Sequence, residues 1–151
     1  MQISVDGTLD TEQFESYSTS KTIYFQSGDG YKTVKVKYKD FTGNIGVQYS
    51  SSIILDTTAQ ETSIVQKPSS STSDASATFT FGFSGDSISD VSFECRMDTS
   101  IFSACASPKS YSGLSSGSHT FYVRAVDAAL NYDATPAEYT WTITGTSTDT
   151  S

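Results

Sequence analysis

Between Val91 and Ile143 the sequence consists of short runs in which apolar and polar residues alternate. The longest spans 117–127 and reads GSHTFYVRAVD, and a later one spans 139–143 and reads YTWTI. A period of two places successive side chains on opposite faces of a β-strand, so each run predicts a strand with one buried face. Turn residues separate the runs, as in β-sandwiches and barrels. We therefore expect an all-β fold of the sandwich type.

Composition agrees with this expectation and excludes several function classes. Charged residues make up only 17% of the 151-residue chain and aromatic residues 13%, which is typical of a secreted β protein. The net charge of −8, with no stripe of Lys or Arg, argues against binding to nucleic acid or to an anionic membrane. No apolar run approaches the length that spans a bilayer.

No arrangement of residues in the sequence predicts catalysis. His119 is the only histidine and has no nucleophile partner in the sequence, so we interpret it as a structural residue at the start of a strand. Trp141 alternates with Tyr139 and Ile143, which favours a core position over an exposed tryptophan that stacks on sugar. We expect a protein that is not an enzyme.

Cys95 and Cys105 are the only cysteines and lie ten positions apart. A hairpin at that spacing would bring them onto neighbouring strands, where the geometry of a disulfide is feasible. A reduced pair and a redox pair are the alternatives, and the absence of a nearby histidine or third cysteine disfavours a metal site. We favour a disulfide, which would indicate an oxidising compartment.

The first 57 residues predict one unit, with strands near residues 3–5, 22–26, 33–39 and 46–55. The strand at 33–39 carries valine and tyrosine on one face and three lysines on the other. We interpret the lysines as protection of an edge strand, with a basic ligand patch as the alternative. The second unit is predicted at 58–144, with Phe79, Phe81 and Phe83 on one core face. Residues 69–76 are expected to form a loop, and residues 145–151 a linker or disordered tail.

Both halves resemble a known family. In the first half the likeness is carried by residues 17–22, 27–30, 32–40, 43–44 and 55–59. In the second it is carried by 93–95, 102–105, 107–108, 111–114, 117–121, 123–125, Asp127, Asn131, 135–137 and 139–143. These runs resemble bacterial immunoglobulin-like repeats, related to fibronectin type III, that occur in tandem in large secreted or cell-surface proteins. One departure is Ala128-Ala-Leu130, where the family usually has glycine before Asn131.

The resemblance implies two consecutive immunoglobulin-like β-sandwich modules. A complete module has about seven strands in roughly 100 residues. The first half would therefore be truncated, lacking its first two strands, whereas the second would be complete and would contain the Cys95–Cys105 disulfide. Half a sandwich exposes apolar side chains, so we expect the first module to be poorly stable or to be completed by strands of another chain.

The resemblance also implies a candidate calcium site at the joint between modules. In an immunoglobulin-like sandwich the loop between the last two strands lies at the pole where the chain enters. That geometry would bring together Asp127, Asn131 and Asp133 with the joint residue Asp56. Calcium binds six to eight oxygens, mostly from carboxylates and carbonyls. The alternative is that these residues cap turns.

These observations predict a non-catalytic extracellular spacer in a surface or adhesin-like protein, with neighbouring repeats of the same polypeptide as its partners. One alternative is a module of a secreted enzyme or viral particle that binds carbohydrate or another surface. Another is a filament subunit assembled by strand exchange between copies. Residues 1–7 do not resemble a signal peptide, so we expect the export signal to lie outside this sequence.

Overall fold

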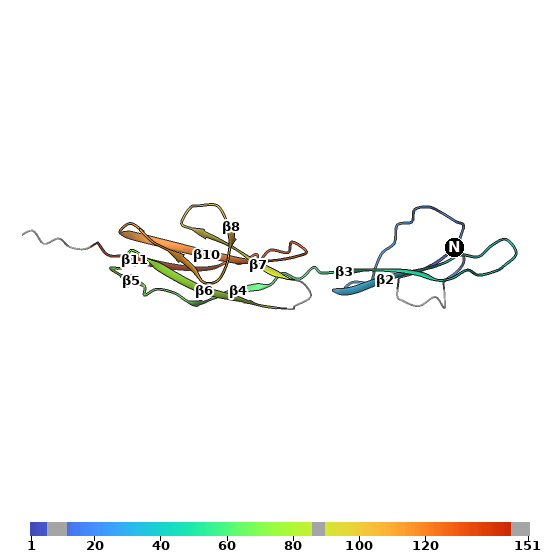
Figure 1. Cartoon of the computed structure of the whole chain (residues 1–151), viewed down its shortest axis with the longest axis horizontal. Coiled ribbons are helices and arrows are strands. Elements are labelled where there is room, and N and C mark those ends of the chain that lie inside the picture. Colours follow the sequence, from blue (N-terminus) through green and yellow to red (C-terminus); the bar gives the residue numbers. More distant parts are fainter. Residues whose placement is uncertain (6–11, 86–89, 146–151) are drawn as a thin grey trace, which may run out of the picture. The chain divides into compact units, whose positions relative to one another are not determined.

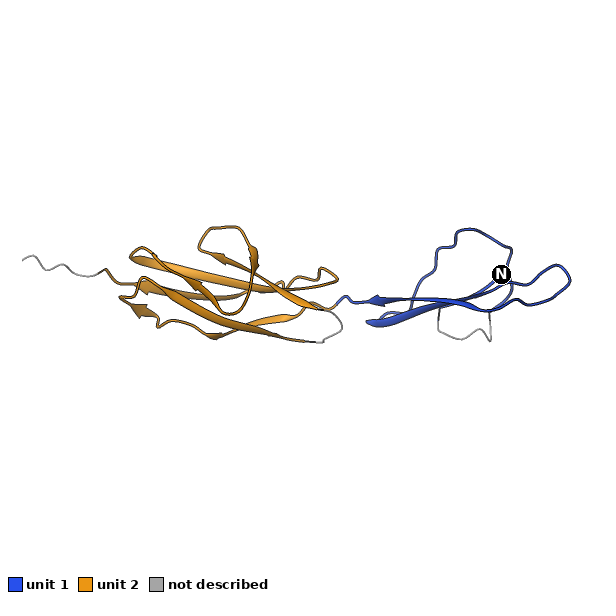
Figure 2. Cartoon of the chain, viewed as in Figure 1, with its two compact units in different colours: residues 1–57 blue, residues 58–151 orange. Residues whose placement is uncertain are grey.

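A computed structural model describes residues 1–5, 12–85 and 90–145 of the chain. Those residues form an all-β protein and contain no helix, so none of them lies in a helix that could cross a membrane. The chain divides into two compact units, residues 1–57 and 58–151 (Figure 2).

Two sheets make up the second unit (Figure 1). One has the strand order β5-β11-β10-β7-β8, with bounds Ser71–Thr72, Ala137–Ile143, Gly117–Asp127, Val91–Met97 and Ser103–Cys105. The other has the order β4-β6-β9, with bounds Glu61–Gln66, Ala77–Ser84 and Lys109–Tyr111. All neighbouring strands are antiparallel except β5 and β11, which are parallel. The predicted loop at 69–76 therefore contains a short strand.

The core of this unit lies between the two sheets. Phe79 of β6 stacks on Phe121 of β10 with their ring centroids 4.2 Å apart, and Trp141 of β11 meets Phe79 edge-on at 5.3 Å. All three side chains are almost completely buried, which confirms the core positions predicted for Phe79 and Trp141. The expectation that Phe83 also fills the core was wrong, because it lies near the end of β6 and is 42% exposed.

The predicted disulfide is present and joins Cys95 of β7 to Cys105, the last residue of β8. The two Cα atoms are 5.8 Å apart, within the ordinary range for a disulfide. The strands are hydrogen-bonded neighbours, so the bridge reinforces the outer pair of the five-stranded sheet.

The first unit contains one sheet with the order β1-β2-β3, spanning Gln2–Ser4, Gly30–Lys37 and Tyr49–Leu55. Because β2 is the central strand, the interpretation of its lysines as edge protection was wrong. Residues 22–26 form no strand. Ile23 instead lies over the apolar face of the sheet, where it lines a hollow of about 200 Å³ with Val34 and Val36. The last strand begins at Tyr49 rather than at residue 46.

The apolar face of this sheet is incompletely covered. Cross-strand register places Val36 beside Ile3 on one side and Tyr49 on the other, so these residues share that face. Tyr49 is nevertheless 60% exposed, and Ile53, four residues along β3 on the same face, is 56% exposed. Among the described residues of this unit no second sheet packs against the face. This is the exposure expected of a single sheet layer.

Candidate functional site

The residues predicted to bind calcium lie in two places. Asp127 ends β10 and is buried, and the loop that follows it contains Asn131. Each carboxylate oxygen of Asp127 accepts a hydrogen bond from Asn131, Oδ1 from the backbone N–H and Oδ2 from the side-chain amide, both at 2.8 Å. Asp127 therefore closes the turn between β10 and β11, which is the capping role considered as the alternative.

Asp133, in the same loop, holds this turn to the other sheet. Its Oδ2 accepts a hydrogen bond from the backbone N–H of Thr62 in β4 at 2.8 Å, and its Oδ1 accepts one from the backbone N–H of Thr135, also at 2.8 Å. Burial tends to raise the pKa of this carboxyl, but the hydrogen bonds together outweigh it and lower the pKa below 3.8. Asp133 is thus an ionised, buried tie between β4 and the loop.

The structure brings Asp127 and Asn131 into contact, with Asp133 in the same loop. Asp56 is buried at the end of the first unit, and so belongs to a different unit from the other three. In the parts of the chain that the structure describes, no group of three or more His, Cys, Asp or Glu side chains is arranged to hold a metal ion. Calcium binding by these residues stays a prediction.

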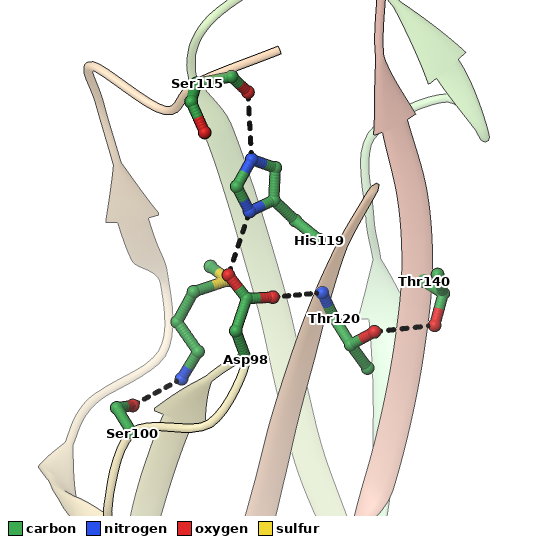
Figure 3. A network of polar contacts seen from close by, with 7 residues as sticks. Asp98, Ser100, Ser115, His119, Thr120 and Thr140 are labelled. Carbon is green, nitrogen blue, oxygen red and sulfur yellow. Dashed lines mark hydrogen bonds and ion pairs between the residues drawn. The ribbon is translucent and has the colours of Figure 1, made fainter. Parts of the chain in front are cut away.

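A second polar cluster lies around His119 in β10 (Figure 3). The imidazole Nδ1 is 2.9 Å from Oδ2 of Asp98, and Nε2 is 2.9 Å from the carbonyl oxygen of Ser115. Asp98 Oδ1 accepts a hydrogen bond from the backbone N–H of Thr120 at 2.7 Å. The ring is buried, and both of its nitrogens have partners. Through Asp98, which follows β7, the cluster joins the turn after β7 to β10.

The partners of His119 favour its charged form. Both ring nitrogens face acceptors, and only the imidazolium can donate from both. The hydrogen bond to Asp98 and then that to Ser115 raise the pKa of His119 above 6.5, against the opposing effect of burial. For Asp98, burial tends to raise the pKa, but the hydrogen bonds from His119 and Thr120 together lower it below 3.8. This cluster is therefore an ion pair at mildly acidic pH, and the structural interpretation of His119 agrees with its contacts.

A third feature, which we did not predict, is an alternating stack of aromatic rings and arginines on the outer face of the five-stranded sheet. The guanidinium carbon of Arg96 lies 4.0 Å from the ring centroid of Tyr122 and 5.0 Å from that of Phe102. That of Arg124 lies 4.3 Å from Phe102 and 4.6 Å from Tyr132. We call these five residues the arginine–aromatic stack.

The two arginines of this stack differ in their ionic partners. Arg124 donates from both Nε and a terminal nitrogen to one oxygen of Glu94, at 2.9 and 2.7 Å. Arg96 has no carboxylate within salt-bridge distance among the described residues, and its Nε is buried without an acceptor. Glu94 and Arg96 flank Cys95, so alternation alone could have predicted that both side chains lie on the outer face. Which residues of β10 they pair with is set only by the fold.

No protein-family model matches this chain, and no curated protein matches it in sequence. Its function is therefore argued from its own residues. The carboxylate clusters around Asp133 and Asp98 both connect separate strands or turns of the second unit through hydrogen bonds. Such clusters stabilise a β fold and fix its loops.

Proposed function

We propose that the protein is a non-catalytic extracellular spacer of a surface or adhesin-like protein. In this proposal its second unit is an immunoglobulin-like sandwich and its partners are neighbouring repeats of the same polypeptide. Three strands packed against the antiparallel set β11-β10-β7-β8 support such a sandwich. The disulfide favours an oxidising compartment.

One observation carries the spacer function, namely the parallel pairing of β5 with β11. β5 follows β4 near the start of the second unit and β11 is the last strand among the described residues, so a pull on both ends draws β5 and β11 in opposite directions. The backbone N–H groups of Thr142 and Thr144 donate to the carbonyls of Ser70 and Thr72, at 2.9 and 2.8 Å. In this geometry the bonds are sheared together rather than broken one after another. Resistance to shear suits a module that transmits tension.

Force spectroscopy of the whole chain, held at its two ends, tests this function. We expect the second unit to rupture in one cooperative event, and Thr144→Pro to lower the rupture force because it removes the N–H that bonds to Thr72. Thr144 lies just beyond β11, so the pairing of β11 with β10 is left intact. Thr144→Val, which keeps the N–H, is the matched control. Equal rupture forces for the two variants would contradict the proposed role of this pairing.

The arginine–aromatic stack supports a second candidate function, binding of an acidic carbohydrate. Rings cover the guanidinium of Arg96, but its terminal nitrogens are not buried and have no partner among the described residues. A guanidinium held in this way can form a bidentate pair with a carboxylate or sulfate. Tyr132, 43% exposed, lies against Arg124 in the same stack and adds an aromatic surface to it.

Calorimetric titration with a polyuronate, and with dextran as a neutral comparison, tests this candidate. We expect the polyuronate alone to bind, and Arg96→Gln to remove the binding. Lys109→Gln is the matched control, because Lys109 also lies over an aromatic ring, that of Tyr111 at 5.4 Å, but outside the stack. Equal affinity of the two variants for the polyuronate, or no binding by the unaltered protein, would leave the stack with a structural role only.

A further inference from the structure

Protection of strand edges differs between the two units. Among the described residues, three sheets end in six edge strands, and five of these are protected in ways that disfavour pairing with another chain. β5, β8 and β9 have two or three residues each. The longer β4 carries Glu61 and has a register shift between Ile64 and Gln66. Beyond β1, Met1 and Glu15 already exchange two backbone hydrogen bonds.

β3 has none of these protections. It is the longest of the six, with seven residues that read YSSSIIL, and it contains no charge, proline or glycine. Its pairing with β2 runs without a shift from Gly30–Leu55 to Val36–Tyr49. Six of its seven residues are exposed, including Tyr49, Ile53 and Ile54. A long, regular and uncharged edge strand is a template for another strand.

We propose that β3 pairs antiparallel with β3 of a second copy of this chain, forming a two-fold symmetric dimer with a continuous six-stranded sheet. The register follows from the apolar face. Tyr49, Ile53 and Leu55 share the face of Val34 and Val36. This face lies on the same side of the sheet in both copies only if the two-fold axis passes where one residue lies opposite its own copy, and not between two residue positions. An axis at Ser52 pairs all seven residues.

That register also explains why a second copy fits better than an unlike strand. It places Tyr49 of each copy opposite Leu55 of the other, and brings the two Ile53 side chains into diagonal contact. Ser52 lies opposite itself. A strand containing charged residues would place them against Tyr49 or Ile53 with no counter-charge in β3. The β3 sequence therefore complements itself.

Charge elsewhere on the sheet does not oppose this dimer. Lys32, Lys35 and Lys37 lie on β2, and the two β2 strands would be three strand spacings apart, about 14 Å. That exceeds the Debye length of about 10 Å at 0.1 M salt, so repulsion between the lysines is largely screened. Each copy has a net charge of −8, so we expect added salt to strengthen the association.

Sedimentation of the full chain over a range of concentrations tests the proposal. We expect a monomer–dimer equilibrium that Ser51→Lys weakens at least about tenfold, because it places a charge opposite Ile53 twice in each dimer. Ser63→Lys is the matched control, the same change at an exposed position of the protected edge β4. The proposal is overturned if the wild-type chain stays monomeric or assembles beyond the dimer. It is also overturned if the Ser51→Lys variant dimerises as strongly as the wild type.

Cross-linking tests the register independently. The described residues contain no free cysteine, so a single introduced thiol reports on its own contacts. Ser52→Cys should form a disulfide-linked dimer under mild oxidation, since residues directly opposite in an antiparallel pair lie within bridging distance. Ser50→Cys should not, because the two Ser50 residues would be about 13 Å apart along the strands. The reverse result overturns the register. Failure of this dimer would leave the response of Thr144→Pro to force, and hence the spacer proposal, unaffected.

Discussion

The ion pair between His119 and Asp98 makes the stability of the second unit depend on pH. The pKa of His119 is raised above 6.5 in the folded state, so its stabilising effect is complete below pH 6.5 and is lost as the pH rises through the folded pKa. The pKa of Asp98 is lowered, so its contribution is present above pH 3.8 and is lost as the pH falls through the folded value. The pair is therefore strongest between these limits.

Asp98→Asn isolates the charge in this pair. Asp98 has a φ of 51°, a conformation that asparagine adopts readily, and an amide oxygen can still accept from Thr120. Hydrogen bonds between charged groups contribute about 1.5–3 kcal/mol, and the 41% exposure of the Asp98 side chain reduces that figure. We expect Asp98→Asn to lower the free energy of unfolding by about 1–2 kcal/mol at pH 5, and much less at pH 9.

Chemical denaturation followed by tryptophan fluorescence measures this effect in the second unit alone, because Trp141 is the only tryptophan and lies in that core. The wild-type protein should lose stability between pH 6.5 and 9, and Asp98→Asn should lose much less. Asp90→Asn, the same change at an exposed position, is the control and should follow the wild type. If Asp98→Asn destabilised the protein equally at pH 5 and pH 9, the ion pair would not be the cause of the pH dependence.

Four further predictions concern the second unit. Replacing Cys95 and Cys105 together by alanine should cost about 2–3 kcal/mol in denaturation, the loop-closure contribution of so short a loop. Phe121→Ala should cost about 3–5 kcal/mol in the same assay, because the ring is fully buried and stacked on Phe79. Leu130→Gly should raise stability by about 0.5–1 kcal/mol, since Leu130 has a φ of 67° and is 68% exposed; an unchanged or lower melting temperature would contradict this. Calorimetric unfolding in calcium and then in chelator tests the predicted calcium site: a bound ion should give a lower melting temperature in chelator, whereas equal values would leave Asp133 with its hydrogen bonds to Thr62 and Thr135 alone and contradict the site.

Much of the second unit could be predicted from sequence because its signals are local. Alternation predicted core positions for Phe79 and Trp141, since a period of two in a strand admits only one buried set. The ten-residue spacing of the cysteines favoured a hairpin and a disulfide for a similar reason. The same rule gave a wrong prediction for Phe83, because alternation does not indicate where a strand extends beyond the opposite sheet.

The first unit shows what local patterns cannot determine. The lysine pattern of β2 is typical of an edge strand, but the order of strands in a sheet depends on pairings between distant residues. Those pairings make β2 the central strand. Residues 22–26 alternate like a strand but form none; Ile23 instead lies over the apolar face beside Val34 and Val36, a contact with distant residues that alternation does not specify.

The sequence by itself therefore determined the all-β class, the buried faces of the longest strands and the disulfide, since each depends on the spacing of neighbouring residues. Only the tertiary structure decided which strands are edges, that Asp133 binds β4, that Arg96 stacks between Tyr122 and Phe102, and that β5 runs parallel to β11. Those contacts join residues far apart in the chain. Their formation depends on the free energy of the whole fold, which no short sequence pattern contains.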